Sequence, residues 1–387
     1  MVWRETGTMD ERVRFVAACL EDEETMSALC AAYSISRKTG YKWLGRYRER
    51  GVAGLADLPR APLHHGRATP VDLVERIIGS KEAHPLWGPK KIMAVLRRSD
   101  PAQLWPAAST AGEILKRAGL VKGRRRARWR GAGGGPFPDP EAPNEVWSAD
   151  HKGWFRTGDG CRCEPLTVMD GHSRYLLGLE ATGSTGETEA WPVFERLFEC
   201  YGLPDRFRSD NGPPFASAGI AGLSPLSVRL VKLDIELERI APGKPQQNGR
   251  HERFHLSLLP LCQAPETDLL AQQRRFDRFR EEYNSVRPHE ALDQTPPAEH
   301  YDRSSRPLPK TMPEPDYPAE AAVRRVRSNG EIKWCGELVY VSHSLVGEPV
   351  AIEETQDGQW ALRFYRHHIG IIDRKRFVLS RRTKQNV

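Results

Sequence analysis

The sequence predicts a multidomain protein with all-α helix-turn-helix units at its N-terminus, an α/β core in its middle and a small β-barrel at its C-terminus. Three patterns lead to this prediction. Apolar residues recur at helical spacing up to residue 121, and short apolar runs alternate with helical segments through residues 144–302. Apolar and polar residues then alternate between turn signals such as Asn329-Gly330 through residues 319–383.

The first helical unit, residues 1–57, has the pattern of a helix-turn-helix. Thr25 and Ser36 are expected to cap its second and third helices. The last helix of this motif enters the major groove of DNA, and here it interleaves basic with aromatic residues. A three-helix bundle with a merely solvated basic face is the alternative. The residues expected to contact DNA are Arg37, Lys38, Lys42 and Arg46.

Residues 66–121 predict a second helix-turn-helix unit, with helices over 71–81, 89–97 and 109–118. Ser109 or Thr110, followed by Glu113, resembles a capping box at the start of the last of these helices. A second unit would lengthen the footprint on one DNA end, whereas a helical spacer would have no such role.

A basic linker rich in Gly and Pro, residues 122–143, separates the helical part from the α/β core. Its cations could contact phosphates and make DNA binding sensitive to salt, although a charged linker is often only solvated. The residues in question are Arg124, Arg125, Arg126 and Arg128.

The composition is compatible with this reading. The 387 residues include 58 Lys and Arg against 51 Asp and Glu, and the net charge of +7 favours a polyanionic partner. No apolar run reaches membrane-spanning length and the polar start of the chain does not resemble a signal peptide, so no membrane partner is expected. Seven scattered cysteines, with a lone C-x-C at Cys161 and Cys163, predict neither a disulfide framework nor a zinc site. A reducing cytoplasm is the expected location.

Three acidic residues occupy positions where they could meet. Asp150 ends a predicted strand at 146–149, Asp210 ends a later one, and Glu252 lies in the first turn or so of a helix that begins near Asn248. Strand ends and a neighbouring helix converge readily in an open sheet. Carboxylate oxygens bind hard cations such as Mg²⁺, and two such ions about 4 Å apart promote phosphodiester chemistry. Asp170 also ends a strand, but we expect it to be structural and to pair with Arg174.

The segments around these acids resemble the catalytic core of retroviral integrases and related insertion-sequence transposases. The resemblance covers about residues 141–301 strongly, and the two ends of the chain more loosely. The matching segments are WSADHKG (147–153), LTVMDGHSR (166–174), SDNG (209–212), PQQNGRHERFH (245–255), YNSVRPHEAL (283–292) and TPPA (295–298).

This resemblance implies a ribonuclease-H-like fold in which Asp150, Asp210 and Glu252 are catalytic and hold Mg²⁺ or Mn²⁺, two ions per site. It implies hydrolysis of one strand at the end of a mobile element, followed by attack of the freed 3′-hydroxyl on target DNA. The expected partners are double-stranded DNA, as terminal inverted repeats and target, and further copies of this chain. A bacterial, nucleoid-associated protein is implied.

The sequence departs from the family pattern in two places. Glu252 follows Asp210 by 42 positions (252 − 210), slightly more than is common, and residues 218–227 look like a small insertion. His151 stands after Asp150, where an aromatic or apolar residue is more usual, and could change the local field or the metal preference. Retroviral integrases also begin with a His/Cys zinc domain, so the helix-turn-helix units point to insertion sequences.

Several residues beside the acids have open roles. Asn211 and Gly212 are expected to shape the loop after one strand, and Asn248 and Gly249 the start of the Glu252 helix. DNA contacts are a second possibility for the polar residues that precede Glu252. The expected contacts are Lys244 and Arg250, with Gln246 and Asn248 as further candidates.

Three alternatives to a transposase remain open from the sequence. His251-Glu252-Arg253-Phe254-His255 is an H-E-x-x-H, the pattern of zinc metallopeptidases, although the polar Pro/Gly turn before it is atypical of them. A non-catalytic DNA-binding regulator derived from a transposase is the second alternative. A ribonuclease H that cuts RNA in hybrids is the third.

Overall fold

The computed structural model describes residues 7–58, 68–121, 137–217, 219, 222–241, 245–355, 357–373 and 377–380. The chain divides into two compact units, Met1–Thr69 and Pro70–Val387. The predicted DNA contacts at Lys244 and in the arginine cluster Arg124, Arg125, Arg126 and Arg128 lie outside the described residues.

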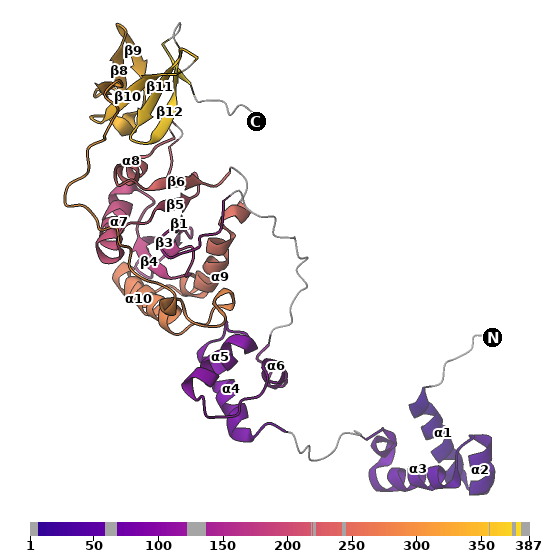
Figure 1. Ribbon diagram of the computed structural model, residues 1–387. Helices are drawn as coiled ribbons and strands as arrows, with labels where there is room; N and C mark the ends of the chain where they lie inside the picture. Colours follow the sequence, from indigo (N-terminus) through magenta and orange to yellow (C-terminus); the bar gives the residue numbers. More distant parts are fainter. Residues whose placement is uncertain are drawn as a thin grey trace, which may run out of the picture. The chain divides into compact units, whose positions relative to one another are not determined.

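The first unit is the predicted helix-turn-helix. It contains α1 (Thr8–Glu21), α2 (Met26–Ala32) and α3 (Arg37–Arg50), followed by a 3₁₀ turn, Gly51–Leu55. Both expected caps are present: the Thr25 hydroxyl accepts from the Ala28 amide at 3.3 Å and the Ser36 hydroxyl from the Thr39 amide at 3.2 Å. Figure 1 shows the three helices. They enclose a small core of Phe15, Val16, Leu29, Cys30, Trp43, Leu44 and Leu55.

Three further helices begin the second unit: α4 (Val71–Ala83), α5 (Pro89–Ser99) and α6 (Ala108–Arg117). They pack around a core that includes Ile77, Trp87, Ile92 and Leu115. The expected capping box at Ser109 or Thr110 is wrong, because α6 already begins at Ala108. The extended backbone of Ala107 makes that residue the N-cap, so the hydroxyl residues fall inside the first turn.

The central sheet combines antiparallel and parallel strands. Its strands are β1 (Val146–His151), β2 (Phe155–Arg156), β3 (Arg162–Asp170), β4 (Leu176–Thr182), β5 (Arg206–Ser209) and β6 (Glu236–Arg239). β3 pairs antiparallel with β4, β1 and the short β2, whereas β1, β5 and β6 run parallel to one another. Three consecutive antiparallel strands followed by two parallel ones agree with the expected integrase-like α/β core.

Helices cover both faces of this sheet (Figure 1). α7 (Glu187–Tyr201) and α8 (Pro225–Lys232) share one apolar cluster with β1, through residues such as Trp147, Phe194 and Leu230. α9 (Gly249–Gln263) and α10 (Leu269–Ser285) share another with β3 and β4, through Met169 and Phe254 among others. α9 thus packs on β3, whose neighbour in the sheet is β1, the strand that carries Asp150. No helix in the described ranges is long and apolar enough to span a membrane.

The C-terminal strands form an open sheet rather than the expected barrel. β7 (Ala322–Arg325), β10 (Pro349–Glu354), β11 (Trp360–Phe364), β12 (His367–Ile372) and β13 (Leu379–Ser380) are ordered β13-β12-β11-β10-β7, and over the described residues β7 and β13 do not pair. β8 (Glu331–Trp334) and β9 (Glu337–Tyr340) form a separate hairpin. The hairpin and α8 add apolar residues to the core of the sheet, among them Ile332 and Val228. The sheet is therefore covered by other elements and does not close on itself.

Candidate active site

Asp150 and Asp210 stand at the same level on neighbouring parallel strands. β1 and β5 pair with Val146 opposite Arg206, Trp147 opposite Phe207 and Ser148 opposite Arg208. Continued in the same register, this pairing sets Asp150 opposite Asp210, which directly follows β5. Both residues are partly buried.

Glu252 approaches this pair from α9, where it lies exposed in the first turn. Burial, followed by the charges of Asp210 and Glu252, raises the pKa of Asp150 to about 7. The three acids therefore lie near enough to act on one another's charge. Within the described ranges, however, no three His, Cys, Asp or Glu side chains are already arranged around a common point that could hold a metal ion.

The loop after β5 is built around Asp210. The Gly212 amide donates to the Asp210 carboxylate at 3.0 Å, and the Asn211 side chain donates to the carbonyl of Ile240 at 2.7 Å. These bonds give Asn211 and Gly212 the loop-shaping role expected of them. Arg239 at the end of β6 is a neighbour that the sequence did not reveal. Burial lowers its pKa to about 10, and the charge of Asp210 acts in the opposite direction.

The segment 218–227, expected to be a small insertion, ends in the first turn of α8. Ser224 caps α8, and Leu226 and Ser227 are fully buried in its first turn. Ser227 also accepts a hydrogen bond from Arg239 at 2.7 Å. This end of the segment is thus part of the core and holds the arginine beside Asp210.

His151 is partly buried next to Asp150, and its ring lies 6.0 Å from that of Phe215. Neither ring nitrogen has a hydrogen-bond partner among the described residues. Burial lowers the pKa of this imidazole. A neutral ring at this position adds little positive charge beside the acids.

The H-E-x-x-H pattern has a different geometry from a zinc site. Nε2 of His251 lies 2.6 Å and Nε2 of His255 3.2 Å from the hydroxyl oxygen of Thr167. Both imidazoles thus converge on a protein hydroxyl, and Glu252 lies exposed beside them. This arrangement does not support the zinc-peptidase alternative. The sequence did not reveal that Thr167 and the two histidines form a hydrogen-bonded network.

Asp170 has the structural role expected of it, but with other partners. It is fully buried and accepts from the amides of Asn144 at 2.8 Å and Ser173 at 2.7 Å, and from the Ser173 hydroxyl at 2.6 Å. The expected pairing with Arg174 is wrong, because that side chain donates to the carbonyl of Gly171 at 2.5 Å. Asp170 therefore closes the turn after β3.

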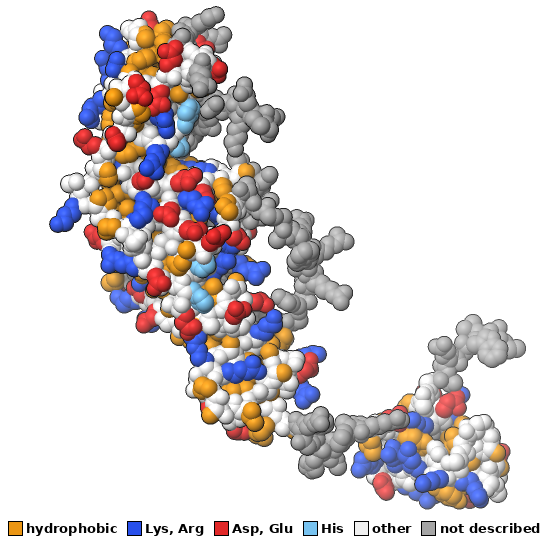
Figure 2. Space-filling model, viewed as in Figure 1, with side chains coloured by type: hydrophobic (Ala, Val, Ile, Leu, Met, Phe, Trp, Pro, Cys, Tyr) orange, Lys and Arg blue, Asp and Glu red, His pale blue; other side chains and the backbone are white. Residues whose placement is uncertain are grey.

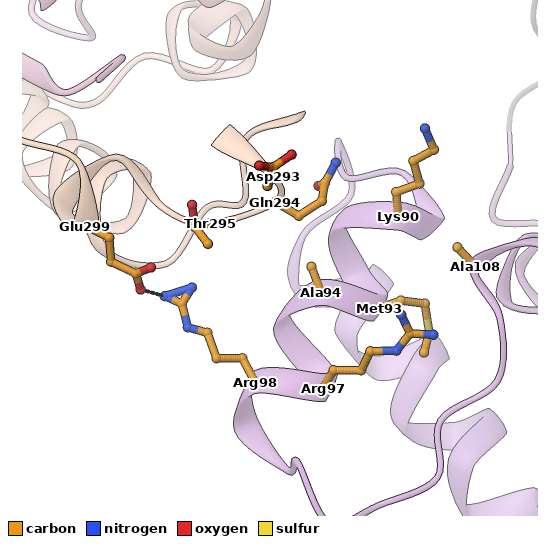
Figure 3. A pocket seen from close by; sticks show the side chains of 10 residues that line it. All are labelled: Lys90, Met93, Ala94, Arg97, Arg98, Ala108, Asp293, Gln294, Thr295 and Glu299. Atoms are coloured by element: carbon orange, nitrogen blue, oxygen red, sulfur yellow. Dashed lines mark hydrogen bonds and ion pairs between the residues drawn. The ribbon is translucent and has the colours of Figure 1, made fainter. Parts of the chain in front are cut away.

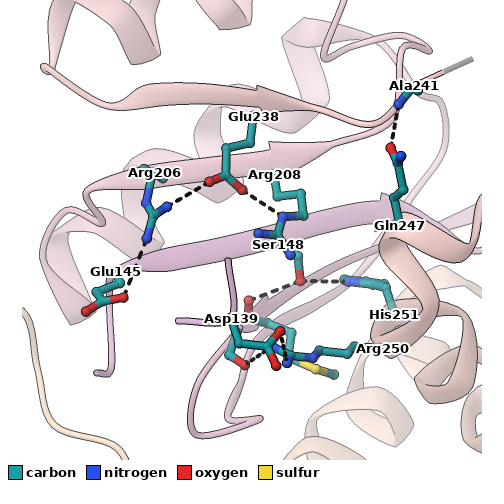
Figure 4. Close-up of polar contacts among 12 residues, drawn as sticks. Asp139, Glu145, Ser148, Arg206, Arg208, Glu238, Ala241, Gln247, Arg250 and His251 are labelled. Atoms are coloured by element: carbon teal, nitrogen blue, oxygen red, sulfur yellow. Dashed lines mark hydrogen bonds and ion pairs between the residues drawn. The ribbon is translucent and has the colours of Figure 1, made fainter. Parts of the chain in front are cut away.

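Side chains at the start of α9 hold it to nearby loops (Figure 4). The Gln247 side chain accepts from the Ala241 amide at 2.7 Å. Arg250 pairs with Asp139 at 2.5 Å and donates to the carbonyl of Gly171 at 3.0 Å. Arg250 thus has partners within the protein, and its contact with DNA stays a prediction.

Four of the basic residues predicted to contact DNA lie on α3. Arg37, Lys38 and Lys42 are exposed, and Arg46 is partly so. Lys42 and Arg46 flank the buried Trp43, with their cationic groups 4.5 and 5.1 Å from its ring centre. Figure 2 shows Lys and Arg side chains gathered on the drawn face of this unit.

The second set of helices has its own contacts with the core. Lys90 and Arg98 of α5 form ion pairs with Glu290 and Glu299, the former at 2.9 Å. Between them lies an open pocket lined by residues such as Arg97 and Thr295 (Figure 3). None of the three predicted catalytic acids lines this pocket, and it is separate from the site described above.

Comparison with known protein families agrees with this order of parts. Residues 11–62 match a helix-turn-helix domain and residues 39–115 a homeodomain-like domain. Residues 140–245 and 233–297 match two integrase core domain families. Residues 321–377 match the C-terminal domain of the IS481 family of transposases.

Two curated relatives come from insertion elements. The chain is 26% identical to the IS407 uncharacterized 31.7 kDa protein of Burkholderia multivorans, over 65% of this chain and 89% of that protein. It is 25% identical to the IS476 uncharacterized 39.2 kDa protein of Xanthomonas euvesicatoria, over 65% of this chain and 71% of that protein.

Among solved structures, a chain from an intasome of simian T-cell lymphotropic virus in complex with a PP2A regulatory subunit is similar to this protein. The match covers 76% of this chain and 97% of that chain, at 15% identity and a TM-score of 0.37. The catalytic core of HTLV-2 integrase with magnesium matches 42% and 99%, at 15% identity and a TM-score of 0.31. Similarity at this level does not extend to function.

Helix-turn-helix units followed by an integrase core define the class of this protein as an insertion-sequence transposase. Within that class, residues 321–377 are similar to the C-terminal domain of the IS481 family.

Proposed function

We propose that this transposase cuts DNA strands at the ends of its element and transfers the resulting 3′-hydroxyl to target DNA, with Asp150, Asp210 and Glu252 as catalytic residues. The observation that carries the proposal is the register of β1 and β5. It sets Asp150 level with Asp210, and Glu252 is near enough for its charge to raise the pKa of Asp150.

The donor set fits Mg²⁺ or Mn²⁺. Hard cations prefer carboxylate oxygens, and all three acids supply them. Burial, followed by the negative charges of Asp210 and Glu252, raises the pKa of Asp150, and a divalent ion would stabilise the ionised carboxylates in such a setting. Two bound ions would activate the attacking oxygen and stabilise the leaving oxygen of the phosphodiester.

The neighbouring residues would keep the acids in position. The Gly212 amide donates to the Asp210 carboxylate, and the Arg239 side chain donates to the Asp210 carbonyl oxygen at 3.5 Å. Thr167 donates to the carbonyl of Asp150 at 2.7 Å and so fixes the end of β1. Glu252 would complete the ligand set by approaching the two aspartates.

The proposed partners are duplex DNA, as terminal inverted repeats and target, and further copies of the chain in the DNA complex. The helix-turn-helix matches support DNA binding by the N-terminal part. We further propose a division into residues 1–57, 66–121, 122–143, 144–302 and 319–383, with the central part catalytic.

The test uses the full chain and duplex oligonucleotides that carry the inverted repeats flanking its gene. We expect strand nicking and joining in Mg²⁺ or Mn²⁺, and a loss of at least a thousandfold in Asp150→Asn, Asp210→Asn and Glu252→Gln while DNA binding persists. The exposed Asp277→Asn on α10 is the matched control and should keep full activity. A wild-type protein that binds the repeats but neither nicks nor joins them would identify a regulator instead. Cleavage confined to RNA in hybrids would identify a ribonuclease H.

A further inference from the structure

A fully buried histidine stands directly before Glu252. His251 has no exposed surface, and both its ring nitrogens face side chains of the sheet. Nδ1 lies 3.0 Å from the hydroxyl oxygen of Ser148 on β1, and Nε2 lies 2.6 Å from that of Thr167 on β3. A buried polar ring of this kind is costly unless both nitrogens are hydrogen-bonded, and here both are.

The hydroxyl of Thr167 fixes the direction of these bonds. It has one proton, which it donates to the carbonyl oxygen of Asp150 at 2.7 Å. The same oxygen must therefore accept from Nε2–H of His251. Nδ1 of His251 then carries the lone pair and accepts from the hydroxyl of Ser148 at 3.0 Å, which is closer than that hydroxyl's other acceptor, the carbonyl of Met169 at 3.4 Å. The result is a directed chain from His251 on α9 through Thr167 to the backbone of Asp150.

His251 differs from the other side chains that hold the start of α9. Gln247 and Arg250 bind residues of loops, namely Ala241, Asp139 and Gly171. His251 instead binds strands β1 and β3, and Figure 4 shows its bond to Ser148 beneath the helix. Its neighbour in sequence is Glu252, so any rotation of the first turn that moves His251 also moves this carboxylate.

We propose that His251 is a positioning residue that sets Glu252 against Asp150 through Thr167 and Ser148, an inference that rests on the proposed function of the three acids. The imidazole does not touch substrate. It links the helix that carries one acid to the strand that carries another, so that both reach the same ions. Residues that orient metal ligands in this way typically change metal affinity by about 10- to 100-fold when they are replaced.

The test measures binding of Mn²⁺ alone to the full-length protein by calorimetry, with Asp150→Asn defining the part of the signal that belongs to the site. His251→Leu keeps apolar volume but removes both bonds, and we expect it to weaken this binding by about tenfold or more. His251→Gln retains a donor toward Thr167 and should restore most of the affinity. Leu258→Val, which trims a fully buried residue on the same helix, is the matched control and should bind as the wild type does.

Hydrogen exchange of α9 provides a second measurement that needs no metal. His251→Leu should speed exchange in the first turns of α9 and leave α10 unchanged. The proposal is overturned if His251→Leu binds Mn²⁺ like the wild type, if His251→Gln fails to recover, or if Leu258→Val loses as much affinity. If wild type itself shows no Mn²⁺ binding that depends on Asp150, the proposed function fails, and hydrogen exchange alone then decides whether His251 holds the helix.

Discussion

Nδ1 of His255 lies 3.9 Å from the carboxylate oxygen Oδ2 of Asp150. The contact joins the second turn of α9 to the end of β1. Burial, followed by the charges of Lys152 and His151, lowers the pKa of His255 to about 4, so this imidazole is neutral at physiological pH. The nearest ring thus adds no positive charge to Asp150, whose carboxylate remains poorly compensated without metal.

The metal-free protein should consequently lose stability as Asp150 ionises. Its pKa is raised from 3.8 to about 7, so the stabilising effect of its proton is complete below about 3.8 and is lost as pH rises through about 7. Asp150→Asn cannot ionise and should be more stable than wild type in EDTA at pH 8, by at most about 4 kcal/mol at about 1.4 kcal/mol per pKa unit. Urea unfolding at pH 5 and pH 8 measures the difference.

The control for this experiment is Asp277→Asn, which removes an exposed carboxylate from α10. This substitution should change the free energy of unfolding only slightly, and by the same amount at both pH values. Mn²⁺ should stabilise wild type at pH 8 more than it stabilises Asp150→Asn, because binding to the folded state adds to its stability. If Asp150→Asn exceeded the wild type in free energy of unfolding by the same amount at pH 5 and pH 8, the raised pKa of Asp150 would be contradicted.

The sequence predicts on which elements the three acids lie, but not the contacts around them. Asp150 and Asp210 were recognisable because each ends a strand, and Glu252 because a polar turn precedes its helix. The bonds of His251 to Ser148 and Thr167 span 103 and 84 residues, and no local pattern marks such pairs. Only the fold brings them together.

The two errors in secondary and tertiary structure have similar causes. The C-terminal strands alternate as a barrel would, but closure depends on whether the edge strands β7 and β13 meet, and alternation is the same in an open sheet. Thr110 and Glu113 have the spacing of a capping box. The backbone of Ala107 nevertheless starts the helix earlier, and this depends on conformation rather than composition.

Two glycines of α3 should respond oppositely to alanine. A Cβ on Gly40 would lie 2.6 Å from Sγ of Cys30 and 2.9 Å from the Phe15 ring, both in the core of the first unit. A Cβ on Gly45 would meet nothing within 4 Å. Gly45→Ala should stabilise this unit by about 0.5–1 kcal/mol through helix propensity, whereas Gly40→Ala should destabilise it by about 1–3 kcal/mol through overpacking.

Circular dichroism of the full-length variants during heating measures both changes. The two substitutions share one helix and one chemistry, so the difference between them isolates the close approach at Gly40. Stabilisation by both alanines would show that α3 packs less tightly against α1 and α2 than the structure indicates.

Lys42 should contribute to DNA binding through phosphate contact. It is exposed on α3 beside Trp43. Lys42→Ala should weaken binding to all duplexes and reduce the slope of log affinity against log salt by about 1, as expected for one lost phosphate contact. Arg14→Ala removes a similar exposed cation from α1 and should leave the slope unchanged. Fluorescence anisotropy over a range of salt concentrations measures these slopes. If wild type and Lys42→Ala had equal slopes, Lys42 would not contact a phosphate.

Glu238 should be essential to the pairing of β5 with β6. Its carboxylate is 7% exposed and binds Arg208 at 2.7 Å and Arg206 at 3.0 Å (Figure 4). Glu238→Gln leaves Arg208 without its counter-charge and Arg206 with only Glu145, at 3.5 Å. Loss of one partner of a buried pair costs about 3–5 kcal/mol. Asp210 directly follows β5, so DNA joining should fall together with stability.

The matched control is Glu353→Gln on the C-terminal sheet. Its partner Arg363 lies 3.2 Å away, but both side chains are more exposed, at 26% and 38%. Exposed pairs contribute about 0–1 kcal/mol, so this variant should unfold at nearly the wild-type urea concentration and retain DNA joining. If Glu238→Gln and Glu353→Gln unfolded at the same urea concentration, burial of the first pair would have no energetic consequence. The position of Asp210 would then depend on other contacts. Two such contacts are the hydrogen bond from the Gly212 amide to its carboxylate and the one from Arg239 to its carbonyl oxygen.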